Sequence, residues 1–208
     1  MRRLKLLFAP AALAVVWGQD PFTIAPTHYH LEFENPWVRV SRISYKVHDK
    51  APLHDHPAVP VVFVYTTDSG PIRFRDDKMG AVTRPAAKAG TIRVTRPAPE
   101  HHAVEYLGKT DTEYLRIELK KAAGEGPERE IRLAPERHES RTQFENSQVR
   151  IVRLWCPELC PASEHPGDPA VVVSMGSREV RWTGAGGAFP WGGAGEYVRL
   201  EMKGGATP

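Results

Sequence analysis

The chain has 208 residues, of which 28 are Lys or Arg and 25 are Asp or Glu, so its formal net charge is +3. A hydrophobic fraction of 41% with 25% charged residues is ordinary for a globular protein and excludes wholesale disorder or a collagen-like fibre. The 19 prolines and 17 glycines are many for a helical bundle, and they favour a β-rich fold with frequent turns.

The N-terminus has the composition of an export signal. Three basic residues within 2–5 precede an apolar run over 6–17, which is too short to span a bilayer as a helix. This order, followed by small residues, predicts a secretory signal peptide at 1–18 that is cut before Gln19. A buried N-terminal helix or an uncleaved anchor is the alternative.

The positive charge belongs to that signal. Removing residues 1–18 takes away three bases and no acids, which leaves 25 basic and 25 acidic residues. A mature chain with zero net charge gives no reason to expect nucleic acid as a partner. We therefore predict a periplasmic or extracellular protein that does not associate with the membrane after cleavage.

Cys156 and Cys160 are the only two cysteines in the sequence. In an oxidising compartment they could form a disulfide with each other. The alternative is two free thiols on either side of a turn. Their spacing, without further cysteines nearby, is a weak signal for a metal site.

Four sequence blocks recur in the same order, which indicates an internal duplication. The first begins Phe33-Glu34-Asn35 and its counterpart begins Phe144-Glu145-Asn146. The paired blocks are 33–43 with 144–154, 51–57 with 160–166, 60–64 with 169–173, and 113–120 with 196–203. The offset between the blocks falls late in the repeat, so the second copy has lost material there.

The repeated blocks read as β-strands. Apolar and charged residues alternate over 115–120 and again over 198–203, which is typical of a strand with one buried and one solvated face. The continuous apolar run 61–65 suits a strand covered on both faces. A polar Gly- and Pro-containing stretch at 121–130 is the expected linker, so we predict one domain over 19–120 and a second over 131–208.

His54-Asp55-His56 carries the clearest chemical signal. Residues i and i+2 of a strand point to the same face, so the two imidazoles should converge. A second cluster follows at 100–102, where Glu100 precedes His101 and His102. Adjacent strand residues face opposite sides, so only one of these two histidines should face inward, and the spacing favours His102. Imidazole nitrogens suit Zn, Cu, Fe and Ni.

These residues resemble the two motifs of the cupin superfamily. His54-x-His56 before an apolar strand corresponds to the first motif, and Gly90, Pro97 and His102 correspond to the second. The resemblance covers about 33–120, and the tandem copy makes the chain similar to a bicupin. It implies an all-β fold of two jelly-roll barrels, with His54, His56 and His102 as three metal ligands.

The sequence departs from the cupin pattern at several positions. The carboxylate ligand of the first motif would fall near Pro60 or Val61, and neither side chain can coordinate a metal. Pro99 stands where the second motif has glycine, and Tyr106 where it has asparagine. Three neutral histidines would leave the charge of a divalent ion uncompensated, which favours an anionic substrate or hydroxide as a further ligand.

The second copy has lost most of these positions. Ser163 replaces the first histidine while His165 remains, and a Gly-rich run over 184–195 stands where the third histidine would lie. We therefore expect an abbreviated, degenerate second cupin domain without metal.

These observations predict a secreted cupin that binds a divalent metal ion (Fe, Zn, Mn, Ni or Cu) and acts on a small anionic molecule, as a dioxygenase or an isomerase. Two alternatives stay open. One is a non-enzymatic protein that binds a small ligand or a structural metal, and the other is a scaffold in which both sites have decayed. Many cupins pair as dimers, so the resemblance implies either a homodimer or an internal pair of the two copies that takes its place.

Overall fold

The computed structural model describes residues 19–76, 80–121, 131–133, 140–160 and 166–203. The predicted signal peptide at 1–18 lies outside the described residues, as does the predicted linker apart from Lys121. The described chain contains the short helix α1 (Pro21–Ile24) and fifteen strands in three antiparallel sheets, so the predicted all-β class is confirmed. Within these residues no helix is long and apolar enough to cross a membrane.

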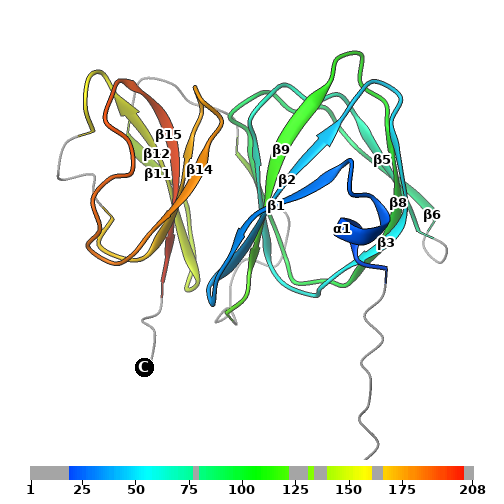
Figure 1. Ribbon diagram of the computed structural model, residues 1–208, viewed down its shortest axis with the longest axis horizontal. Coiled ribbons are helices and arrows are strands. Elements are labelled where there is room, and N and C mark those ends of the chain that lie inside the picture. The colour runs from blue at the N-terminus through cyan, green and yellow to red at the C-terminus, as the bar shows by residue number, and fades with distance from the viewer. Residues whose placement is uncertain (1–18, 77–79, 122–130, 134–139, 161–165, 204–208) are drawn as a thin grey trace, which may run out of the picture.

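The first copy contains two sheets that face each other (Figure 1). The six-stranded sheet has the order β1 (Tyr29–Glu34), β2 (Val38–Tyr45), β9 (Thr112–Leu119), β4 (Val61–Tyr65), β7 (Ile92–Thr95) and β10 (Ile131–Leu133). The four-stranded sheet has the order β3 (Lys50–His56), β8 (Glu100–Tyr106), β5 (Ile72–Asp76) and β6 (Gly80–Arg84). Buried side chains from both sheets, such as Phe63 and Val104, form the core between them.

The described strands of the second copy form one five-stranded sheet. Its order is β11 (Arg141–Glu145), β12 (Val149–Cys156), β15 (Gly195–Met202), β13 (Ala170–Ser174) and β14 (Val180–Thr183). This order repeats β1-β2-β9-β4-β7 of the first copy strand for strand. β10 follows the predicted linker in sequence yet pairs with β7, so it lies at the edge of the first copy's sheet.

The two copies begin with the same hairpin. The Oδ1 atom of Asn35 accepts hydrogen bonds from the backbone amides of Trp37 and Val38, at 2.8 and 3.0 Å. The Oδ1 atom of Asn146 accepts two equivalent bonds in the second copy, each 2.8 Å long. The strands before each turn also carry a register shift at the same place, Leu31/Phe33 and Thr142/Phe144.

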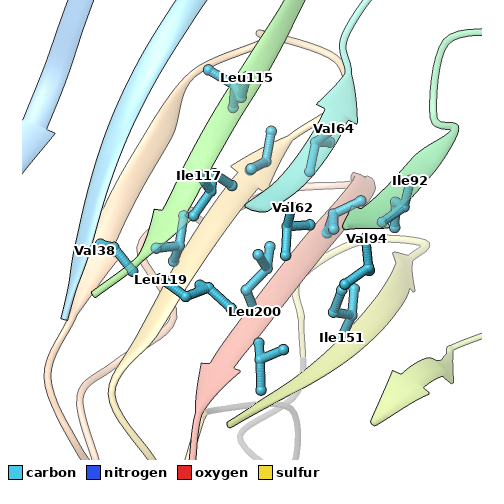
Figure 2. Close-up of a cluster of buried hydrophobic side chains, with 14 of the residues drawn as sticks. Val38, Val62, Val64, Ile92, Val94, Leu115, Ile117, Leu119, Ile151 and Leu200 are labelled. Atoms are coloured by element: carbon cyan, nitrogen blue, oxygen red, sulfur yellow. The ribbon is translucent and has the colours of Figure 1, made fainter. Parts of the chain in front are cut away.

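The two copies pack sheet against sheet through an apolar core. Figure 2 shows Ile117 and Val62 of the first copy facing Leu200 and Ile151 of the second. All four side chains are fully buried. Because the alternating residues of the paired strands point to one face, each sheet supplies a continuous apolar surface to this core.

The other face of the second copy's sheet is covered by its own chain. Phe189 and Trp191, from the Gly-rich run, pack on buried residues of β12, β13 and β15. Cys156 and Cys160 form a disulfide, and Cys160 packs against the same cluster. The pairing that the sequence left open is therefore the one the structure adopts.

Candidate metal centre

The three predicted histidines come from two neighbouring strands of the four-stranded sheet. His54 and His56 lie on β3, His102 lies on β8, and His54 is directly paired with His102 across the antiparallel ladder. Strand alternation sends all three side chains into the barrel, where they are 0%, 7% and 8% exposed.

The imidazole rings form one compact cluster. Their centroids lie 5.0 Å apart for His54 and His56, 4.9 Å for His54 and His102, and 5.4 Å for His56 and His102. Each ring offers a nitrogen, and the three nitrogens lie within 4.8 Å of one another. Two nitrogens bound to one zinc ion lie at most about 4.2 Å apart, so metal binding would draw the rings slightly together.

One nitrogen of this cluster is an unused hydrogen-bonding group. The Nε2 atom of His102 is buried and has no hydrogen-bond partner among the described residues. Burying such a group without a partner is costly, and a metal ion would satisfy it. The donor set therefore fits a transition-metal ion.

The hydrogen bonds of His54 assign its ring nitrogens. Its Nδ1 atom lies 2.7 Å from the carbonyl oxygen of Pro52, and because a carbonyl only accepts, Nδ1 carries the proton. The Nε2 atom of the neutral ring is then an acceptor, and the hydroxyl of Tyr29 donates to it at 2.8 Å. Nε2 is thus the atom that His54 can offer to a metal.

Burial keeps the three imidazoles neutral. Loss of solvent lowers the pKa of His54, lowers that of His56 well below its ordinary value, and brings that of His102 to about 3. The positive charge of Arg116 contributes to the low pKa in each case. Neutral imidazoles keep their lone pairs free, as metal ligation requires.

A buried arginine links two carboxylates beside the histidines. Arg116 on β9 donates from Nε to Glu118 at 3.0 Å, and from its two terminal nitrogens to Glu100 at 3.0 and 3.3 Å. An oxygen of Glu118 lies 3.8 Å from Nδ1 of His56, and an oxygen of Glu100 lies 3.9 Å from Nδ1 of His102.

This arginine network bears on two expectations. The charged residues of 115–120 were expected on a solvated face, but Arg116 and Glu118 are 2% and 5% exposed, because the four-stranded sheet covers them. The sequence also predicts no carboxylate at the first-motif position near Pro60 or Val61, and it leaves Glu100 as a solvated turn residue, a general base or a further ligand. The carboxylates of Glu100 and Glu118 lie beside the histidines, on strands other than the one that the cupin motif implies.

The side chains of Arg116, Glu100 and Glu118 together carry a formal net charge of −1. Burial alone would raise the pKa of Glu100, but the charge and hydrogen bonds of Arg116, together with the nearby His56 and His102, lower this pKa to about 2. Glu100 is therefore ionised at neutral pH. The sequence signal for this network was the Arg-x-Glu pattern on β9, which was read only as strand alternation.

His101 lies on the opposite side of β8 from His102. Its Nδ1 atom is paired with a carboxylate oxygen of Asp55, and the two side chains are 41% and 34% exposed. The expectation that His102 rather than His101 faces inward is confirmed.

The described residues of the second copy show part of this arrangement. Arg199 and Glu201 of β15 form a buried ion pair at 2.9 Å, in the positions that correspond to Arg116 and Glu118. Ser163 and His165, on which the expectation of a degenerate site rests, lie outside the described residues.

Comparisons with known proteins connect this geometry to a fold. No protein-family model and no curated protein matches the sequence. Among solved structures, the bacterial pirin YhhW from Escherichia coli in complex with nickel(II) is similar with a TM-score of 0.56 and 7% identity, over 84% of this chain and 90% of that one. YhaK from Escherichia coli is similar with a TM-score of 0.51 and 14% identity, over 85% of this chain and 92% of that one. AerE from Microcystis aeruginosa is similar with a TM-score of 0.50 and 12% identity, over 85% of this chain and 98% of that one.

These similarities extend over both copies, and the identities are low, so what they establish is the fold. The chain has a pirin-like tandem cupin fold, as its motifs predicted. The first copy supplies both sheets of a cupin barrel, and the described part of the second supplies one.

Proposed function

We propose that this chain binds one divalent transition-metal ion through His54, His56 and His102. The observation that carries the proposal is a buried cluster of three neutral imidazoles in which Nε2 of His102 has no other described partner. The structurally similar Escherichia coli pirin was solved in complex with nickel(II), which supports a metal in a protein of this fold. Fe, Zn, Mn, Ni and Cu all suit an imidazole-rich site, so the ion is one of these.

The charges around the cluster favour an anionic ligand for this ion. The network of Arg116, Glu100 and Glu118 carries one net negative charge, which leaves one positive charge of a divalent ion unbalanced. A small anion can complete the balance. A bound ion would act as a Lewis acid toward such an anion. The reactions we propose for such a metal-dependent cupin are those of a dioxygenase or an isomerase that acts on a small anionic molecule.

Metal reconstitution tests the binding step. We expect the metal-free protein to take up one ion per chain, and its unfolding to be shifted by about 2.7 kcal/mol when free metal exceeds the Kd by 100-fold. The five candidate ions are compared in parallel by thermal unfolding and by elemental analysis after gel filtration. Failure of all five to bind would exclude the proposal.

Turnover then separates the reaction classes. The loaded protein is incubated with anionic enediols, thiols and 2-oxo acids while oxygen uptake and product formation are followed. Oxygen uptake with product identifies a dioxygenase, and product without oxygen uptake identifies an isomerase. Metal binding with neither would favour the alternative, a non-enzymatic ligand-binding or structural cupin.

We also propose that the chain acts outside the cytoplasm. The basic and apolar composition of 1–18 supports export, and the Cys156–Cys160 disulfide is the kind of bond that persists in oxidising compartments. The test is to recover the protein from the periplasm and the medium and to identify its first residue by mass spectrometry. We expect the recovered chain to begin at Gln19.

A further inference from the structure

Tyr29 on β1 reaches into the histidine cluster from the facing sheet. Its ring lies 5.0 Å from that of His54 and 5.7 Å from that of His56, measured between centroids. The residue is 4% exposed, and Phe22 of α1 packs edge-on against it at 6.4 Å. The ring is packed on several sides, so its hydroxyl is kept close to the cluster.

The Tyr29 hydroxyl is hydrogen-bonded to the nitrogen of His54 that a metal would bind. It donates to Nε2 of His54 at 2.8 Å, and Nδ1 of that ring is already used by the Pro52 carbonyl. An ion bound to His54 must take the lone pair of Nε2. The Tyr29 O–H then loses its acceptor, and because its oxygen lies along that lone pair, the hydroxyl must shift aside to a place next to the ion.

A second tyrosine is hydrogen-bonded to the Tyr29 hydroxyl. The oxygen of Tyr45 lies 3.2 Å from that of Tyr29, and Tyr45 is 1% exposed. Tyr45 can donate to the Tyr29 oxygen, which leaves the Tyr29 proton for a different acceptor. An anion bound to the metal would be such an acceptor.

We propose that Tyr29 is a ligand-binding residue whose hydroxyl donates a hydrogen bond to an anion bound at the metal. This inference rests on the proposed function, because it needs a metal at His54, His56 and His102. It adds a specificity element: the site would prefer a ligand whose metal-bound end can accept a hydrogen bond over one that cannot. Hydrogen bonds to charged groups are among the stronger ones, so the preference should be measurable.

The test uses copper(II) as the ion and azide as the anionic probe. Azide is titrated into copper-loaded wild type, Tyr29→Phe and Tyr45→Phe while its charge-transfer absorption is recorded. We expect Tyr29→Phe to weaken azide binding about tenfold and Tyr45→Phe to weaken it much less. Copper should remain at one ion per chain in all three proteins, because the histidines are intact.

A neutral probe separates ligand recognition from a general disturbance. Imidazole can bind copper but presents no acceptor to Tyr29, so its affinity should be the same in wild type and Tyr29→Phe. Equal weakening of azide and imidazole would mean that the substitution only perturbs the site and would overturn the inference. Unchanged azide affinity in Tyr29→Phe would overturn it as well.

Two further outcomes point elsewhere. A phenolate-to-copper absorption in wild type before azide is added, lost in Tyr29→Phe, would make Tyr29 a metal ligand and would overturn the donor role. Wild-type protein that binds no copper and none of the other candidate ions would overturn the proposed function and this inference with it. Copper bound normally, with azide unaffected by Tyr29→Phe, overturns the inference alone.

Discussion

The two copies share a scaffold but differ in the sheet that carries the chemistry. β1-β2-β9-β4-β7 and β11-β12-β15-β13-β14 have the same order, and their opening hairpins contain the same asparagine turn. His54, His56 and His102 all lie on β3 and β8, in the four-stranded sheet that has no counterpart among the described strands of the second copy. Among the described residues, the histidine cluster therefore belongs to a sheet that only the first copy shows.

The polar face of the shared sheet shows what remains without the histidines. Arg116 pairs with Glu118 in the first copy, and Arg199 pairs with Glu201 in the second, at 3.0 and 2.9 Å. The arginine–glutamate pair therefore forms both beside the histidine cluster of the first copy and in the second copy. In the first copy, β8 of the facing sheet adds Glu100 to this pair and so connects it to the histidines.

The largest expected effect is the loss of metal binding when a histidine of the first copy is removed. His102→Ala should lower metal affinity by more than the roughly 10–100-fold seen when a residue that only orients a ligand is lost. Elemental analysis and metal titration of the purified variant measure this effect.

The neighbouring histidine is the matched control. His101→Ala should retain one ion per chain, because His101 lies on the outer face of β8 and pairs with Asp55. Metal retained in His102→Ala and lost in His101→Ala would mean that the inward face of β8 is assigned incorrectly.

Removing the central arginine should produce the next largest effect. Arg116→Met leaves Glu100 and Glu118 without their shared cation in a buried setting, at an expected cost of about 3–5 kcal/mol. Urea unfolding of metal-free protein measures the loss.

The second copy provides the comparison for this variant. Arg199→Met should cost less, because Glu201 keeps a second cation, with Nη1 of Arg150 at 3.7 Å. Adding Glu118→Gln to Arg116→Met should recover part of the stability, since one stranded charge is removed. Equal losses in the two arginine variants would show that Glu100 adds nothing to the first network.

The sequence predicted the repeated scaffold better than the surroundings of its charged face. Local patterns were enough to identify the strands, the duplication and the inward histidine, because these depend on alternation and order. The burial of Arg116 depends on a second sheet that covers it, and a charged residue alternating with apolar ones looks the same on a solvated face. The pairing of β10 with β7 depends likewise on contacts distant in sequence.

The common core between the copies gives a third prediction. Leu200→Ala and Ile117→Ala each remove a fully buried side chain from the same cluster, so each should cost about 2–5 kcal/mol. Because both sheets share this core, each variant should unfold in a single transition, detected alike by tryptophan fluorescence and far-ultraviolet circular dichroism. Two separate transitions, with Leu200→Ala affecting only one, would mean that the copies unfold independently.

The smallest expected effect concerns the turn that both copies retain. Asn35→Ala and Asn146→Ala each remove an acceptor of two backbone hydrogen bonds, and each should cost about 1 kcal/mol in urea unfolding. Asn→Asp at either position keeps an acceptor oxygen and should cost less. The two turns have nearly identical geometry, so the two alanine variants should agree closely. A clear loss for Asn35→Ala with none for Asn146→Ala would show that only the first copy still depends on the turn, which would make the shared hairpin a relic of the duplication rather than a common support.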